Sequence, residues 1–308
     1  MSSESAFIDT LRALATDPAA RGLVDDAAVL ETGDGALVLT HDMIVEGVHY
    51  LAGDPPEDVA WKLVAVNLSD LAAKGARPIG ALLGFTLGDD QWDRAFAAGL
   101  GTALTAFGLP LLGGDTVSAP ARVLGLTAIG RAAMTPPNRS GARPGDLLWV
   151  SGTIGDAGAG LRILKGELGA SPALVERYRT PRPRLEAGGR LAPLVAAMMD
   201  VSDGLLLDAA RMADASGCAV RIALDAVPLS DAYLALLGEA RLEAAGAGDD
   251  YELLFATRKA VAPAVLALAE EIGLPLSRIG GFEAGAGLSL TDRGAAVPLP
   301  EKLGFEHG

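Results

Sequence analysis

The feature that most constrains this chain is the position of its aspartates. Carboxylates occur in short segments flanked by Gly, Ser or Thr, and several stand where an apolar run ends: Asp25, Asp26, Asp42, Asp70, Asp115, Asp200, Asp203, Asp249 and Asp250. Small neighbours let a ligand approach a carboxylate at the end of a strand. Magnesium prefers oxygen ligands in near-octahedral geometry and usually reaches a protein through carboxylates and substrate phosphates. The pattern therefore predicts a metal-dependent protein that handles phosphate groups.

Composition narrows the class of protein. A chain of 308 residues is long for one core and favours two domains. Half of its residues are hydrophobic and 21% are charged, which suits a large core and argues against disorder. The net charge of -14 argues against a nucleic-acid-binding surface. It is compatible with a nucleotide ligand, because bound metal ions invert the local charge.

Cysteine usage and hydropathy indicate a cytoplasmic protein. The single cysteine, Cys218, excludes a disulfide framework within one chain and the common zinc–cysteine patterns. The start of the sequence carries no signal peptide, and no run of about 18 apolar residues predicts a membrane span. We therefore expect a protein that binds neither membrane nor nucleic acid.

Apolar runs and helical spacing predict a mixture of strands and helices. Strands are expected at 36–40, 79–87, 109–112, 122–132, 147–150, 196–199, 219–224 and 251–257, with short strands near the C-terminus. Helices are expected at 59–74, 91–107, 185–195, 205–216 and 260–272, and after Gly155-Asp156. The order shows no strict βαβ alternation, which favours α+β domains. The Pro- and Gly-containing stretch 135–146 predicts a boundary between domains 1–138 and 139–308.

The segment 39–43 gives the most specific signal for a ligand site. A lone charge at the end of a buried strand is unfavourable unless it is paired or bound to a metal. The competing interpretation of Asp42 is a turn or helix-cap aspartate. The nearby Gly47-Val-His49 favours the ligand interpretation, because it can complete a polar pocket. His49 by itself is ambiguous.

Other motifs leave two interpretations open. Asp70 shares a helix face with Asn67 and Lys74, so it is either a ligand or half of an i,i+4 ion pair with Lys74 on a solvated face. The GGDT segment at 113–116 suits close approach to a nucleotide, or a plain turn. The DVSDG segment at 200–204 suits a helix N-cap, a metal and phosphate site, or both.

Three further features are equally open. The Gly-rich run 152–160 can bind phosphate at a helix N-terminus or form a structural turn, and no P-loop motif is present. The DDYE segment at 249–252 is a hairpin turn or a substrate loop. Arg139 is a candidate phosphate contact, although an exposed arginine often has no special role.

Taken in order, these segments closely resemble the thiamine-monophosphate kinase family. The matching stretches run through nearly the whole chain at compatible spacing: DDAAV at 25–29, THDMIVEGVH at 40–49, AVNLSDLAAKGA at 65–76, GGDT at 113–116, RSGARPGD at 139–146, GTIGD at 152–156, DVSDGL at 200–205 and GDDYEL at 248–253. The wider superfamily contains aminoimidazole-ribonucleotide synthetase, selenophosphate synthetase and a hydrogenase-maturation carbamoyl dehydratase, all of them ATP-dependent.

The resemblance implies an α+β fold of two domains in a homodimer. The strands of an N-terminal mixed-sheet domain would form a dimer-spanning barrel, with ATP in the cleft beside a C-terminal α/β domain. It also implies direct phosphoryl transfer from ATP to thiamine monophosphate, giving thiamine diphosphate and ADP. Such a transfer needs mainly positioning and charge neutralisation, which several Mg²⁺ ions can supply where no P-loop lysine exists.

The same resemblance implies the site residues. Positions that bind metal ions in the family match Asp26, Thr40, His41, Asp42, Asp70, Asp115, Asp200 and Asp203. Of these we assign Asp42, Asp70 and Asp203 to catalysis. Positions that contact ATP match Gly114, Asp115, Arg139 and Ser202, and those that hold the thiamine phosphate match His49, Asp249 and Phe305. The family usually has Thr in place of His41, so this chain lacks a side-chain oxygen ligand there and keeps only the backbone carbonyl.

Rival functions fit the sequence less well. Selenophosphate synthetase requires an N-terminal reactive cysteine and the carbamoyl dehydratase a C-terminal one, whereas Cys218 is the only cysteine. Aminoimidazole-ribonucleotide synthetase fits the 249–253 segment less closely. A nucleotide-binding regulator without catalysis has no need of six carboxylates, since two carboxylates about 4 Å apart repel each other by about 1–4 kcal/mol.

Overall fold

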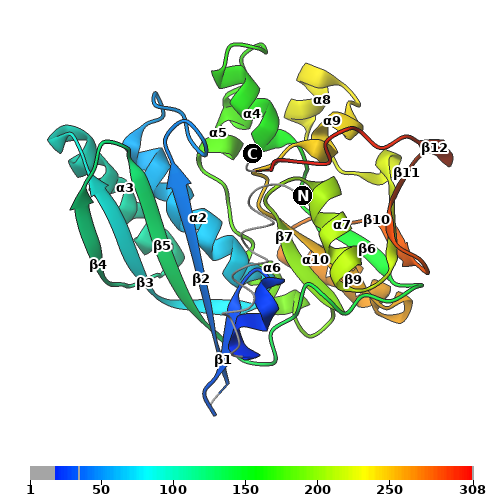
Figure 1. Ribbon diagram of the computed structural model, residues 1–308. Coiled ribbons are helices and arrows are strands. Elements are labelled where there is room, and N and C mark those ends of the chain that lie inside the picture. The colour runs from blue at the N-terminus through cyan, green and yellow to red at the C-terminus, as the bar shows by residue number, and fades with distance from the viewer. Residues whose placement is uncertain (1–17, 34, 307–308) are drawn as a thin grey trace.

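The computed structural model describes residues 18–33 and 35–306. Residues 1–17 of the predicted N-terminal domain lie outside the described part. The described chain forms two sheets with helices, which confirms a mixed α+β fold (Figure 1). Residues 133–146, between the strands of the two sheets, form no helix or strand. The predicted domain boundary falls in this stretch and stays a prediction.

The first sheet is mixed and has helices against one face. Its order is β1 (Ala28–Glu31), β2 (Ala36–Val45), β5 (Val123–Ala132), β3 (Ala76–Leu87) and β4 (Leu111–Ser118). Only β3 and β4 pair in parallel. The helices α2 (Pro56–Ala73) and α3 (Asp90–Phe107) cover one face, and no described helix covers the other (Figure 1).

The second sheet belongs to the C-terminal half. Its order is β12 (Ala295–Val297), β11 (Gly287–Asp292), β8 (Ala219–Ala223), β10 (Leu276–Glu283), β6 (Leu147–Ser151), β9 (Glu252–Thr257) and β7 (Ala197–Val201). Its helices are α4 (Asp156–Leu164), α5 (Pro172–Arg179), α6 (Leu185–Leu191), α7 (Leu205–Ala215), α8 (Asp231–Leu237), α9 (Arg241–Gly246) and α10 (Ala262–Ile272). Short 3₁₀ helices occupy Pro18–Leu23, Leu224–Ala226 and Lys259–Val261.

Helix α2 joins the two halves. It contacts α3 and the strands of the first sheet, and it also contacts α5, α6, β7 and β9. Its side chains are therefore buried around almost the whole circumference, which explains the apolar composition of the segment. The helix begins with Pro56 at its first turn, where a missing N–H leaves no hydrogen bond unmade.

Several element boundaries differ from the prediction, three of them by four residues or more. Strand β2 does not end before His41 but continues to Val45, because it pairs with β5 along its whole length. Strand β4 includes the GGDT segment, which was predicted to follow a strand ending at residue 112. Helix α6 ends at Leu191 and not at residue 195, because Pro193 has no backbone N–H to donate the hydrogen bond that would continue the helix.

Within the part of the chain that the structure describes, no helix is long and apolar enough to cross a membrane.

Candidate functional site

A cavity of about 650 Å³ lies between the two halves of the molecule. It is bordered by β2 and α2 on the N-terminal side, and by the loops after β7 and before β9 on the C-terminal side. Most of the predicted site residues line it: Asp26, Asp42, His49, Asp70, Arg139, Asp200, Ser202, Asp203, Asp249 and Phe305. The fold thus brings together residues that are up to 279 positions apart in sequence (from residue 26 to residue 305).

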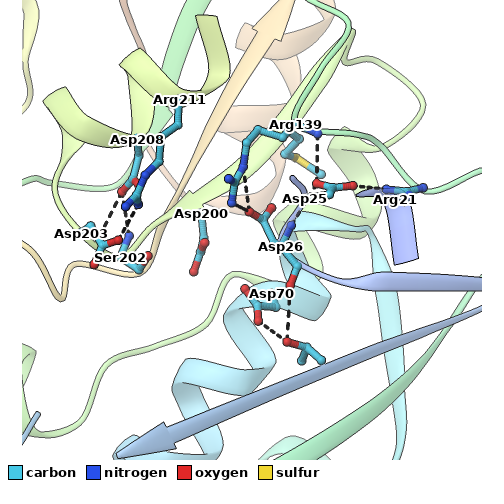
Figure 2. Close-up of polar contacts among 12 residues, drawn as sticks. Arg21, Asp25, Asp26, Asp70, Arg139, Asp200, Ser202, Asp203, Asp208 and Arg211 are labelled. Atoms are coloured by element: carbon cyan, nitrogen blue, oxygen red, sulfur yellow. Dashed lines mark hydrogen bonds and ion pairs between the residues drawn. The ribbon is translucent and has the colours of Figure 1, made fainter. Parts of the chain in front are cut away.

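Helix α2 positions the acidic side chains at the floor of the cavity. The Asn67 Oδ1 accepts the backbone N–H of Asp42 at 2.9 Å, which fixes β2 against the helix. Asp70 accepts a hydrogen bond from the Thr40 hydroxyl, and the Ser69 hydroxyl donates to Asp200 at 2.6 Å. Carboxylates from β2, α2 and β7 are therefore held by neighbouring turns of one helix. Figure 2 shows Asp26, Asp70 and Asp200 around one region.

Three of these carboxylates lack a cationic partner. Within residues 18–33 and 35–306, no lysine or arginine forms an ion pair with Asp42, Asp70 or Asp200. Burial, together with the charges of Asp26 and Asp203, raises the pKa of Asp42 to about 6. Burial and neighbouring aspartates likewise raise the pKa values of Asp70 and Asp200 well above the usual range. A cation placed among them would relieve this repulsion.

Two further aspartates beside this region, Asp25 and Asp26, are neutralised by cationic side chains. Lys74 Nζ lies 2.6 Å from Asp25 Oδ1 and 2.7 Å from Asp26 Oδ2, and the ammonium is fully buried. Arg139 pairs with Asp26, and Arg21 pairs with Asp25. Burial favours the neutral form of Asp26, but the charges of Lys74 and Arg139 outweigh it and lower the pKa of this carboxyl.

The loop after β7 is held by helix α7. The Asp208 carboxylate accepts the backbone N–H groups of Ser202 and Asp203, both at 3.1 Å, and Arg211 bridges Asp203 and Asp208 (Figure 2). Burial and the charge of Asp203 outweigh the charges of Arg211 and Arg139 and raise the pKa of Asp208 to about 7. The N-cap interpretation of this loop is wrong: Gly204 precedes α7 and no side chain caps the helix.

Two of the predicted substrate-binding residues, His49 and Asp249, lie beside Lys62 of α2. Lys62, on α2, donates from Nζ to Asp249 Oδ2 and to the carbonyl oxygen of His49, both at 2.9 Å. The Tyr251 hydroxyl donates to the other oxygen of Asp249 at 3.0 Å. The loop before β9 thus contacts α2 directly, and Asp249 adopts a positive φ of 70°. It is a loop that faces the cavity and not a hairpin turn.

The chain near its C-terminus also reaches the cavity. The backbone N–H of Phe305 donates to the carbonyl oxygen of Asp203 at 2.8 Å, which anchors the segment beside the loop after β7. Phe305 lines the cavity and its side chain is partly exposed. An aromatic side chain therefore stands at the rim.

The Gly-rich run is not a free phosphate cradle. The Asp250 carboxylate accepts the N–H groups of Gly155 at 2.7 Å and Ala157 at 3.3 Å, at the N-terminus of α4. These donors already have a partner within the protein, so the structural interpretation of this run holds for them. Gly155 is required for a different reason: its φ is 89°, which favours glycine.

Two parts of the predicted site lie elsewhere in the chain. Gly114 and Asp115 are exposed on β4, at the edge of the first sheet, and do not line the cavity. Asp42 lies on β2, which is separated from β4 by β5 and β3. His41 alternates with Asp42 along β2, so its imidazole lies on the other face of the sheet, with Nδ1 2.9 Å from the Thr127 hydroxyl. Only its backbone carbonyl can face a metal beside Asp42.

The carboxylates that line the cavity suit Mg²⁺ ions whose remaining ligands are water and substrate phosphates. Within the described residues, no three His, Cys, Asp or Glu side chains form a group that could hold a metal ion by themselves. Mg²⁺ commonly uses one or two carboxylates and completes its shell with water and substrate phosphates. Buried carboxylates without cationic partners, lining an open cavity, suit that mode of binding.

Sequence reasoning missed several residues that shape this site. One of the two open interpretations of Asp70 paired it with Lys74 on a solvated face; instead Lys74 is buried and pairs with Asp25 and Asp26. The apolar residues around the whole of α2 were the available signal, because a lysine in such a helix must find an acidic partner inside. Lys62 carried the same signal. Nothing local in the sequence pointed to Asp208.

Comparisons with known proteins agree with this architecture. Sequence models of the AIR synthase related protein match the chain, the N-terminal domain at residues 24–132 and the C-terminal domain at residues 143–293. The fold and its acidic cavity thus place the protein in the class of AIR synthase related proteins.

Individual relatives identify one family within this class. The chain is 43% identical to the thiamine-monophosphate kinase of Caulobacter vibrioides over 305 residues, which covers 95% of this chain and 86% of the relative. It is 37% identical to the Salmonella typhimurium enzyme, with coverage of 93% and 91%. A solved structure of AaThiL complexed with AMPPCP and TMP has a TM-score of 0.86 at 32% identity, covering 99% and 97% of the two chains. The chain therefore belongs to the thiamine-monophosphate kinase family of enzymes.

Proposed function

We propose that this protein transfers the terminal phosphoryl group of ATP directly to the phosphate of thiamine monophosphate, giving thiamine diphosphate and ADP. The observation that carries the proposal is the cavity in which Asp42, Asp70 and Asp200 lie without a cationic partner among the described residues. Metal ions bound together with two phosphate-bearing substrates would supply the positive charge that this arrangement lacks. The relatives named as thiamine-monophosphate kinases, and AaThiL complexed with AMPPCP and TMP, support the choice of substrates.

Metal ions would bind at the floor of the cavity. Asp42, Asp70, Asp200 and Asp203 supply carboxylate oxygens, and the backbone carbonyl of His41 is a further candidate. Bound Mg²⁺ neutralises the charge of the phosphate oxygens and of the aspartates. The chain positions these carboxylates, because Asn67 and Ser69 hold the strands that carry Asp42 and Asp200. A rigid set of ligands favours phosphoryl transfer, because this reaction depends mainly on alignment and charge.

ATP and the acceptor would share this cavity. Arg139 and Ser202 line the cavity near Asp26 and Asp203 and are proposed ATP contacts. His49, Asp249 and Phe305 also line it and are proposed contacts of thiamine monophosphate. The backbone N–H groups of Asp249 and Phe305 bond the loop that carries Ser202 and Asp203, so the two sets of contacts are neighbours. The Asp249 carboxylate suits a cationic organic group, and Phe305 suits a ring. We propose that a phosphate oxygen of thiamine monophosphate attacks the terminal phosphorus of ATP beside the metal-binding residues, and that ADP leaves.

We further propose a homodimer. The uncovered face of the first sheet bears exposed apolar side chains, with Met43 51%, Leu82 42%, Leu112 60% and Val117 53% exposed. A patch of this kind on a soluble protein suits a protein–protein interface. A second copy that covers this face offers a route by which its own Gly114–Asp115 segment reaches the nucleotide end of the cavity. A dimer-spanning barrel would have this arrangement, and a cytoplasmic location stays a prediction.

Product analysis tests the choice of acceptor. The purified protein is incubated with Mg²⁺, thiamine monophosphate and ATP labelled in its terminal phosphate, and the products are separated by chromatography. The proposal predicts label in thiamine diphosphate and one ADP for each product molecule. Release of ADP without labelled thiamine diphosphate would indicate a different acceptor. ATP binding without any turnover would indicate a regulatory protein.

A further inference from the structure

The Asp25–Asp26 pair differs from the rest of the acidic floor in its surroundings. Lys74 is fully buried, and its Nζ lies 2.6 Å from Asp25 and 2.7 Å from Asp26. The same ammonium donates to the carbonyl oxygen of Met198 at 3.3 Å. Arg21 and Arg139 add a second cation to each aspartate (Figure 2). Two carboxylates are therefore matched by three cationic side chains.

The contrast with the neighbouring aspartates is sharp. Asp42, Asp70 and Asp200 line the same cavity, and in the described part of the chain none of them forms an ion pair with a lysine or arginine. One end of the acidic floor is thus supplied with positive charge by the protein itself. The other end depends on ions that come with the substrates.

We propose that the buried ammonium of Lys74 takes the place of a divalent metal ion at the Asp25–Asp26 pair, so that Asp26 is not a metal ligand in this protein. This inference refines the proposed metal-dependent kinase function, because it assigns the metal ions to Asp42, Asp70, Asp200 and Asp203. It also revises the assignment of Asp26 that the family resemblance implied.

Electrostatics and packing support this replacement. A divalent ion bound to Asp26 would lie beside a buried ammonium and a guanidinium, and like charges in a poorly solvated region repel strongly. Lys74 cannot turn toward solvent, because its side chain has no exposed surface. Loss of its carboxylate partners would leave a buried, unpaired charge, which is strongly unfavourable. The ion pair is therefore a fixed part of the site.

Counting bound metal ions tests the proposal without requiring turnover. Mn²⁺ bound per chain is measured by electron paramagnetic resonance and by calorimetry, with a nonhydrolysable ATP analogue present. We compare the wild type with Lys74→Met, Asp26→Asn and the double variant. Lys62→Met is the matched control, because it also removes a buried lysine that pairs with an aspartate, but at the other end of the cavity.

The expected counts are specific. Asp26→Asn binds as many Mn²⁺ ions as the wild type, Lys74→Met binds one more, and the double variant returns to the wild-type count. Lys62→Met leaves the count unchanged. Loss of one ion in Asp26→Asn would overturn the proposal, as would an unchanged count in a folded Lys74→Met protein.

The metal counts remain decisive if a variant does not fold or if the protein does not form thiamine diphosphate. If Lys74→Met does not fold, as judged by circular dichroism, the Asp26→Asn count decides alone, because that variant keeps the lysine. Failure to form thiamine diphosphate would overturn the proposed reaction and leave the metal counts, and the inference about Lys74, unaffected.

Discussion

Asp42 is the residue on which turnover should depend most. Its backbone is fixed by Asn67, and its carboxylate has no cationic partner among the described residues. Replacement by asparagine keeps the shape but removes a charge that a metal ion requires. We expect Asp42→Asn to lower kcat by about a hundredfold or more, as measured by ADP release, with a much smaller change in ATP affinity.

A surface substitution provides the control for this variant. Asp90 is exposed at the start of α3, where it pairs only with the exposed Arg94. Asp90→Asn makes the same chemical change outside the cavity and should leave kcat within about twofold. Equal activity of Asp42→Asn and Asp90→Asn would contradict the role given to Asp42.

The raised pKa of Asp42 predicts a pH dependence of stability. This pKa is about 6, mainly because the group is buried, against a usual value of 3.8. The metal-free folded state therefore holds more protons than the unfolded state between these values, and its stability falls as pH rises through them, by about 3 kcal/mol at most for this group. Mg²⁺ requires the ionised form and opposes the fall.

Thermal unfolding measures this effect. In EDTA the melting temperature should fall between about pH 4 and pH 6, and added Mg²⁺ should raise it more at the upper end of the window. The slope in EDTA should be shallower in Asp42→Asn, which cannot titrate at this position. The same slope in both proteins would show that other groups are responsible.

Some of the site residues could be predicted from the sequence, and others could not. The aspartates could be predicted, because short Gly-flanked acidic segments are local patterns. The direction of the His41 side chain was not predicted, because the predicted strand ended at residue 40. In the structure β2 continues, and side chains alternate along it. The partners of Lys62 and Lys74 could not be predicted, because Asp249 and Asp25 lie far away in the chain and meet these lysines only in the folded protein.

At the scale of elements, the contact between α2 and α6 offers a direct test of packing. A Cβ atom added at Gly188 would overlap the backbone carbonyl of Ala72, whereas one added at Gly189 would meet nothing within 4 Å. We expect Gly188→Ala to lower the free energy of unfolding by about 1–3 kcal/mol, measured by urea denaturation.

Gly189→Ala is the matched control in the same helix. Its position is exposed, and alanine favours a helix over glycine by up to about 1 kcal/mol, so this variant should be neutral or slightly more stable. Equal destabilisation by both substitutions would show that α6 does not pack closely on α2.

The type of most elements could be predicted, but their ends could not. The helical spacing of α2 and α3 and the apolar runs of β3 and β5 gave these elements to within a few residues. Strand β4 was cut short because Gly113 and Gly114 indicate a turn locally, whereas parallel pairing with β3 keeps them in the strand. Such pairing depends on a segment 31 residues earlier in the chain, since Gly114 pairs with Leu83.

At the scale of the whole molecule, the uncovered sheet face predicts a dimer. Leu112→Asp places a charge on the most exposed apolar side chain of this face and should convert a dimer into a monomer in sedimentation experiments. Leu266→Asp is the control, because Leu266 is also exposed, at 52%, but lies on α10 in the other half. A wild-type monomer, or a Leu112→Asp dimer, would contradict the proposed interface.

We propose that buried aspartates and metal ions together drive phosphoryl transfer to thiamine monophosphate. The measurement that tests it most directly is the rate of thiamine diphosphate formation by metal-stripped protein as free Mg²⁺ is increased. We expect no product in EDTA, a rise to saturation with Mg²⁺, and almost no response in Asp42→Asn. Product formation in EDTA at the rate seen with Mg²⁺ would contradict it.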